Sequence, residues 1–191
     1  MVNTEATIVS QYTTVVGALD QMFQEMDLRS NGSLWRWKNS PFEGVGSCKY
    51  ISKSPSESGL VGPARNTLIE LRQQRVKDFP GSSSVSSCPY HRENHGCVLG
   101  NLKSPLCISH IDGYDPMAGY DELRDRFGIK SNHLTSDISW ILRSILESND
   151  PTQNSQFISE ACNGISQMTQ HIKRFPILHT DKPTQVAISK I

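Results

Sequence analysis

The sequence carries no net charge, no long apolar run and no targeting segment. Its 191 residues include 19 Lys and Arg against 19 Asp and Glu. This balance argues against a protein that coats nucleic acid through a broad basic surface. No apolar stretch approaches the ~20 residues of a membrane-spanning helix. Because the start, Met-Val-Asn-Thr-Glu-Ala-Thr, also lacks the basic and apolar regions of a secretory signal, we expect a cytoplasmic protein that does not enter a membrane.

Familiar catalytic motifs are missing as well. The sequence has no phosphate-binding loop, no dinucleotide fingerprint, no Gly-x-Ser-x-Gly and no His-Glu-x-x-His. A Cys–His nucleophile could be drawn from Cys97 with His95 or His110, but nearness in sequence is not the geometric test of such a pair. A metal-dependent enzyme of unknown reaction stays open as one alternative.

Apolar residues at steps of three and four predict a mostly helical chain. The predicted helices cover residues 3–28, 63–80, 120–127, 136–150 and 157–175. No stretch shows the alternation typical of strands. We therefore expect a mainly α, bundle-like single domain over residues 1–175, with a long irregular cysteine-bearing loop and a C-terminal tail at 176–191.

Particular residues mark the predicted helix faces and ends. The apolar stripe of the second helix consists of Leu68, Leu71, Val76 and Phe79, and the first residue of that helix is Pro63. Gly128 is a suitable C-cap for the third helix, and Thr135 or Ser136 can cap the fourth. The fourth helix has the apolar face Ile138, Ile141, Leu142 and Ile145. The face of the last helix is Phe157, Ile158, Ala161, Ile165, Met168 and Ile172.

The cysteines hold most of the functional information. Of five in the chain, Cys88, Cys97 and Cys107 fall in one stretch that is rich in Gly, Pro, Asn and Ser, which predicts a loop. In a reducing cytoplasm clustered cysteines bind metal more often than they form disulfides, and an odd number cannot pair completely. With Cys48 they supply four thiolates, a complete shell for zinc or an iron–sulfur cluster. Cys162 lies on the apolar edge of a predicted helix and is interpreted as a packing residue.

The cysteine spacing favours a cluster over a single ion. Cys88 and Cys97 are nine positions apart, and Cys97 and Cys107 are ten apart. A zinc knuckle instead separates two cysteines by about two to four residues. We therefore predict an iron–sulfur cluster of the 4Fe-4S type held by Cys48, Cys88, Cys97 and Cys107, with zinc as the alternative. One of His91, His95 and His110 could replace a thiolate, although a solvent-facing loop histidine is the simpler interpretation for the first two.

Three short motifs in this stretch carry a family resemblance. They are Cys88-Pro-Tyr, Gly96-Cys97-Val-Leu and Lys103-Ser-Pro-Leu-Cys107. Together they resemble the later motif of the zinc- or iron-chelating cysteine-cluster proteins, the YkgJ-like family. That family groups further cysteines upstream, where this chain has Cys48 alone. The resemblance implies metal binding with no assigned reaction.

These observations predict an iron–sulfur cluster-binding protein with a redox or sensing role and a redox or regulatory protein as its partner. A second interpretation comes from the helix, glycine and helix of residues 121–141, which resemble a helix-turn-helix. The protein would then be a zinc-stabilised or cluster-dependent DNA-binding regulator. The groove-contacting residues would be Lys130, Ser131, Asn132, His133 and Ser136. Acidic Asp137 and the neutral total charge argue against DNA, and two packed helices are the simpler explanation.

Overall fold

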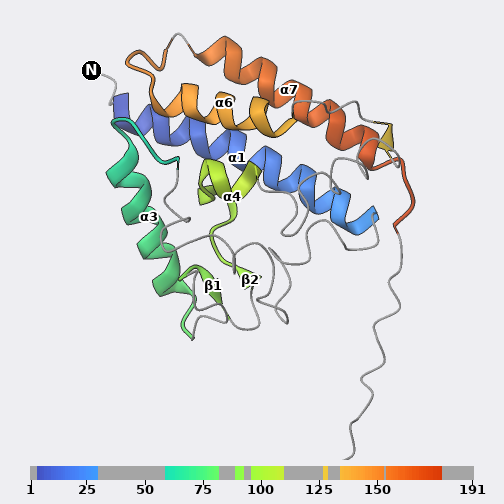
Figure 1. Cartoon of the computed structure of the whole chain (residues 1–191), viewed down its shortest axis with the longest axis horizontal. Coiled ribbons are helices and arrows are strands. Elements are labelled where there is room, and N and C mark those ends of the chain that lie inside the picture. Colours follow the sequence, from blue (N-terminus) through green and yellow to red (C-terminus); the bar gives the residue numbers. More distant parts are fainter. Residues whose placement is uncertain are drawn as a thin grey trace, which may run out of the picture.

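The computed structural model describes residues 4–29, 59–81, 89–92, 96–109, 127–128, 134–152 and 154–177 (Figure 1). The longer helices are α1 Thr4–Arg29, α3 Arg65–Asp78, α6 Leu134–Leu146 and α7 Ser155–Ile172. Between α3 and α6 lie the strands β1 His91–Arg92 and β2 Gly96–Cys97, the 3₁₀-helix η3 Gly100–Leu102, and α4 Pro105–Ser109. The predicted mainly α fold class is confirmed.

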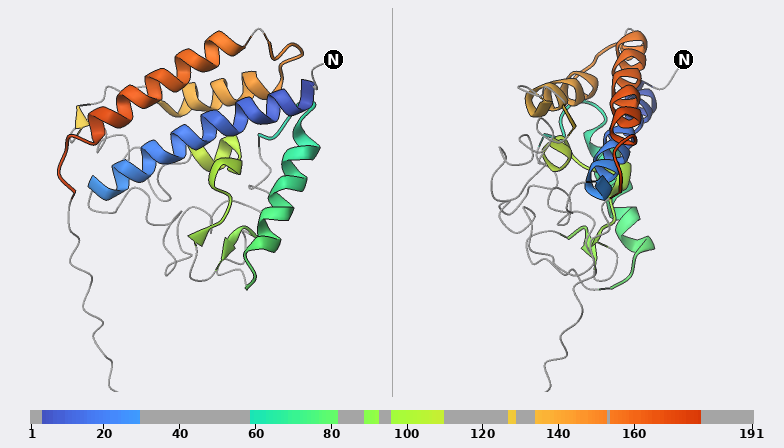
Figure 2. Two further views of the ribbon diagram at one scale, coloured as in Figure 1. Left: turned by 180° about the vertical axis from the view of Figure 1, so that it is seen from behind. Right: turned by 90° about the vertical axis from the view of Figure 1, so that its right-hand side faces the viewer.

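Helix α1 is the central element of the described structure. Its inner face is completely buried and consists of Ile8, Tyr12, Val15, Val16, Leu19, Met22, Phe23 and Met26. Helix α7 runs parallel to it. Gln11 Nε2 donates to the Pro151 carbonyl at 2.7 Å near the start of both helices, and Arg29 Nε donates to the Phe175 carbonyl at 3.0 Å near their ends. Helix α6 packs on α1 in the opposite direction (Figures 1 and 2).

The predicted apolar faces of the last two helices are confirmed. Ile138, Leu142 and Ile145 of α6 are buried, as are Ile158 and Ile172 of α7. The predicted start of α6 is wrong, because the helix begins at Leu134 and its two candidate caps, 135 and 136, lie inside it.

Helix α3 departs from its predicted stripe. Leu68 is buried as expected, but Leu71 is 39% exposed and Arg72 is 0% exposed. Leu68 and Arg72 are four positions apart and therefore face the same way. The long arginine side chain can follow the inner face and still reach a backbone carbonyl. The helix also starts two residues after the expected Pro63.

Phe127 and Gly128 form a short described segment that contacts α7. Gly128 has φ 64, the left-handed conformation expected of a C-cap glycine. The carbonyl of the buried Phe127 is 2.7 Å from His171 Nε2 of α7. Residues 120–126, residues 129–133 and most of the predicted tail lie outside the described residues, so the DNA-binding interpretation stays a prediction. Among the helices described, none is both long and apolar enough to cross a membrane.

Candidate metal centre

Cys97 lies on a short hairpin. Strands β1 and β2 are antiparallel, with His91 paired to Cys97 and Arg92 paired to Gly96. The Val98 amide donates to the Tyr90 carbonyl at 3.0 Å, which extends the pairing by one residue. Cys97 is half-buried and packs against the hydrophobic core. The register places a predicted thiolate ligand directly opposite a candidate histidine ligand.

Cys107 lies in the short helix α4, so the prediction of an irregular loop is wrong at this point. The hydroxyl of Ser104 accepts the Cys107 amide at 3.2 Å, and Pro105 occupies the first helical position, where no amide donor is needed. This Ser-Pro pair is a local start signal that the composition of the stretch obscures. Cys107 is half-buried, and the next residue, Ile108, is completely buried.

The chain between these two cysteines is attached to the helices at Leu102 and Lys103. Arg72 Nε of α3 donates to the Leu102 carbonyl at 2.7 Å. The Tyr12 hydroxyl of α1 donates to the Lys103 carbonyl at 2.7 Å. The Lys103 ammonium forms an ion pair with Asp20 of α1. All five residues are buried. We call this group of five the anchor.

Two anchor residues, Arg72 and Tyr12, share their electrostatic environment with the nearby thiol of Cys107. Burial raises the pKa of Tyr12 far above its usual value, the positive charge of Arg72 opposes this rise, and Cys107 adds to it. Tyr12 is therefore a neutral hydrogen-bond donor at physiological pH. The Arg72 guanidinium also lies 5.5 Å from the centre of the Tyr90 ring, within cation–π range.

The four predicted ligands are only partly within the described structure. Cys48, Cys88, His95 and His110 lie outside the described residues, as does the side chain of His91. Strand β2 and helix α4 lie at opposite ends of the 96–109 segment in each of the three views, so the structure does not bring the elements of Cys97 and Cys107 side by side (Figures 1 and 2). Within the described ranges, no three His, Cys, Asp or Glu side chains gather as a metal site requires. The four-cysteine set stays a prediction.

Cys162 has the environment expected of a packing residue. It is half-buried on α7 and packs against the hydrophobic core. Burial raises the pKa of its thiol. Because a raised pKa leaves less of the reactive thiolate at neutral pH, this environment disfavours nucleophilic chemistry at Cys162.

Among the anchor residues, the sequence motifs include only Lys103, which opens the motif that ends at Cys107. Two of them nevertheless carry a recognisable signal. Asp20 stands four positions after Val16 and Arg72 stands four positions after Leu68, so each charge falls on the buried face of its own helix. A charged residue on such a face indicates a buried polar partner.

No protein-family model, curated protein or solved structure matches this chain. The resemblance to the YkgJ-like family therefore stays a prediction from the motif alone.

Proposed function

We propose that this protein binds an iron–sulfur cluster through cysteine thiolates, including Cys97 and Cys107, and has a redox or sensing role. The observation that carries the proposal is the anchor, which attaches the chain between these cysteines to α1 and α3. Burying an ion pair and an arginine is unfavourable unless each is well paired. Buried, paired charges around one short segment fix its backbone in place. A segment that carries metal ligands requires such a fixed backbone.

The charges of the anchor suit this ligand. A cluster held by four thiolates is anionic. Arg72 supplies a buried positive charge near Cys107, because Arg72 and Cys107 both influence the pKa of Tyr12. When bound, such a cluster supplies electron-transfer chemistry. The chain's own residues hold it and tune it through nearby charge and burial. Cys48 and Cys88 would complete the ligand set.

A structural zinc site is the second candidate, and the hairpin register favours it. Cysteine and histidine are the usual ligands of structural zinc. His91 lies opposite Cys97 in the antiparallel pair, and Cys88 precedes His91 by three positions. A site built on this hairpin would not need Cys107, so the separation of β2 from α4 is no obstacle to it.

Metal analysis of protein purified without oxygen tests the proposal. We expect a brown protein with iron and acid-labile sulfide in equal amounts. Cys97→Ala and Cys107→Ala should both lose the metal, whereas the matched control Cys162→Ala should keep it. A colourless protein with stoichiometric zinc, lost in Cys97→Ala and His91→Ala but kept in Cys107→Ala, would select the zinc site. A wild-type protein that holds neither metal overturns both.

A further inference from the structure

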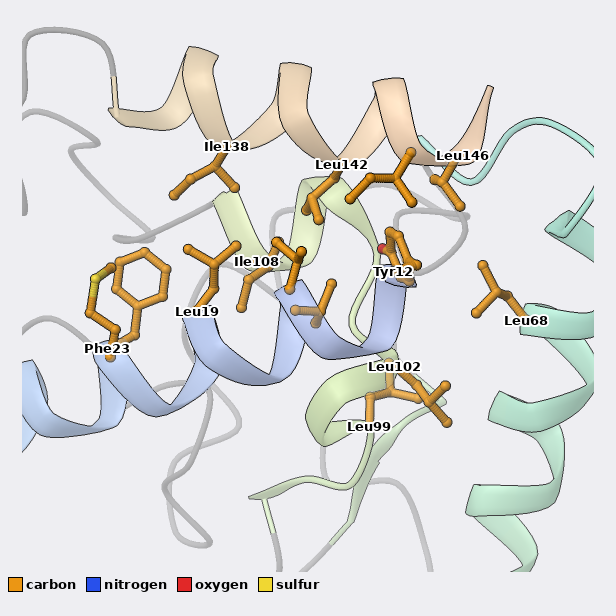
Figure 3. Close-up of a cluster of buried hydrophobic side chains, with 14 of the residues drawn as sticks. Tyr12, Leu19, Phe23, Leu68, Leu99, Leu102, Ile108, Ile138, Leu142 and Leu146 are labelled. Carbon is orange, nitrogen blue, oxygen red and sulfur yellow. The ribbon is translucent and has the colours of Figure 1, made fainter. Parts of the chain in front are cut away.

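Helix α6 presents a tryptophan to solvent on the side away from the core. Figure 3 shows Ile138, Leu142 and Leu146 pointing from α6 toward the buried interior. Trp140 stands two positions from Ile138 and two from Leu142, which places it on the opposite face at about 100° per residue. It is 62% exposed, more than any other large apolar side chain in the described ranges. Tryptophan is enriched among the residues that dominate binding energy at protein interfaces.

The Trp140 ring is held by a second ring, that of Phe157 in α7. The two ring centroids are 5.8 Å apart, and the ring planes meet at 88°. Phe157 is half-buried and packs against the hydrophobic core, so its position is fixed. We call these two side chains the aromatic corner. Because the corner is already assembled, a ligand that binds there loses little affinity to ordering it.

The helices that carry the aromatic corner are acidic. Between residues 134 and 170 the sequence has one basic residue, Arg143, and four acidic ones, Asp137, Glu147, Asp150 and Glu160. Arg143 Nε donates to Glu147 at 2.8 Å, so the single positive charge is already paired. This surface repels nucleic acid and anionic lipid, and a symmetric dimer through it would bring like charges together. Charge complementarity therefore selects a cationic partner.

We propose that the aromatic corner binds an arginine side chain in a basic segment of a partner protein. A guanidinium is planar and stacks on an aromatic face, with cation–π attraction at up to about 6 Å from the ring centre. Glu160 is exposed and stands three positions after Phe157 on α7, so its carboxylate lies beside the corner and attracts the same cation. This inference is independent of the proposed metal.

A titration with short synthetic peptides tests the proposal. Peptides with three arginines, three lysines or three glutamates, each separated by glycine, are added to the isotope-labelled full chain. The indole N–H signal of Trp140, identified by its absence in Trp140→Phe, is followed by NMR. We expect the arginine peptide to shift this signal most, the lysine peptide less and the glutamate peptide not at all. Binding should weaken between about 50 mM and about 500 mM salt, because exposed charges are screened.

Variants show whether the rings and the charge carry the binding, which is followed in them through the amide signals of α7. Trp140→Ala should weaken the arginine peptide about fivefold or more, and Trp140→Phe should lose less. Arg143→Gln removes the competing cation and should strengthen binding about twofold, a response that a purely apolar contact would not give. The matched control is Leu71→Ala on α3, which removes another exposed apolar side chain and should bind like wild type.

Three results would overturn the inference. The glutamate peptide could shift the Trp140 signal as strongly as the arginine peptide, or Trp140→Ala could bind the arginine peptide as tightly as wild type. The third is a Trp140 signal that moves with protein concentration alone, which would show that a second copy of the chain covers this face.

Discussion

The ion pair between Asp20 and Lys103 offers the sharpest test of how the cysteine segment is held. Lys103 is 1% exposed and Asp20 is 6% exposed, so neither charge is solvated by bulk water. Removing one partner leaves the other charge buried without compensation, at a cost of about 3–5 kcal/mol. We expect Lys103→Met and Asp20→Leu each to lower the free energy of unfolding by this amount, measured by urea unfolding followed by circular dichroism.

The double variant decides whether the two side chains act as a pair. Replacing both charges by apolar groups of similar size removes the desolvation penalty together with the attraction, and such replacements are often neutral or stabilising. Asp20→Leu with Lys103→Met should therefore recover most of the loss, with a coupling energy of about 3 kcal/mol. The matched surface control is the ion pair between Arg143 of α6 and Glu147 just after it, whose side chains are 67% and 47% exposed. Its coupling should be about 0.5 kcal/mol or less.

Two results would refute this reasoning. If the single variants cost as little as those of the surface pair, Asp20 and Lys103 are solvated and the anchor does not hold the segment. If the single variants are costly but the double variant costs their sum, the two residues are buried separately and do not interact.

Three further predictions concern particular positions in the fold. A Cβ at Gly62 would lie 1.8 Å from the Leu146 carbonyl oxygen, and φ there is +73. Gly62→Ala should therefore lower the unfolding free energy by more than the about 1–3 kcal/mol of left-handed backbone strain. In Gly100→Ala, where φ is +51 and nothing lies within 4 Å, only that strain should appear, and equal losses in urea would contradict the contact. Gly164→Ala, in the middle of α7 with open space around it, should add about 1 kcal/mol and raise Tm, and a lower Tm would show a hidden clash. Because the pKa of Tyr12 is raised in the folded state, stability should be complete below about pH 10 and fall above it by up to ~1.4 kcal/mol per pH unit, whereas in Tyr12→Phe this part of the fall should be absent from urea midpoints between pH 8 and 11.

The helices are predictable from sequence because each buries one apolar face. In α1 the apolar residues recur from Ile8 to Met26, over about five turns without a break, so the pattern predicts the type of the element and most of its extent. Helix α3 is an exception to this rule. It has few apolar residues, so the pattern cannot distinguish Leu71 from Arg72 as the inward residue. The choice depends on a carbonyl of Leu102, 30 positions away in the sequence.

The cysteine segment is harder to predict because long-range polar contacts determine its position. Asp20 and Lys103 are 83 positions apart, and neither residue has a local pattern that identifies the other. What the sequence does show is a carboxylate on the buried face of α1, which requires a cation or donor nearby. Within residues 89–92 and 96–109 the Lys and Arg residues are Arg92 and Lys103, and Arg92 Nε donates to the Phe79 carbonyl at 3.1 Å beside the end of α3. Lys103 is then the cation that forms the ion pair with Asp20. Cys107, four residues further on, is positioned by that pairing together with the local start of α4 at Ser104 and Pro105.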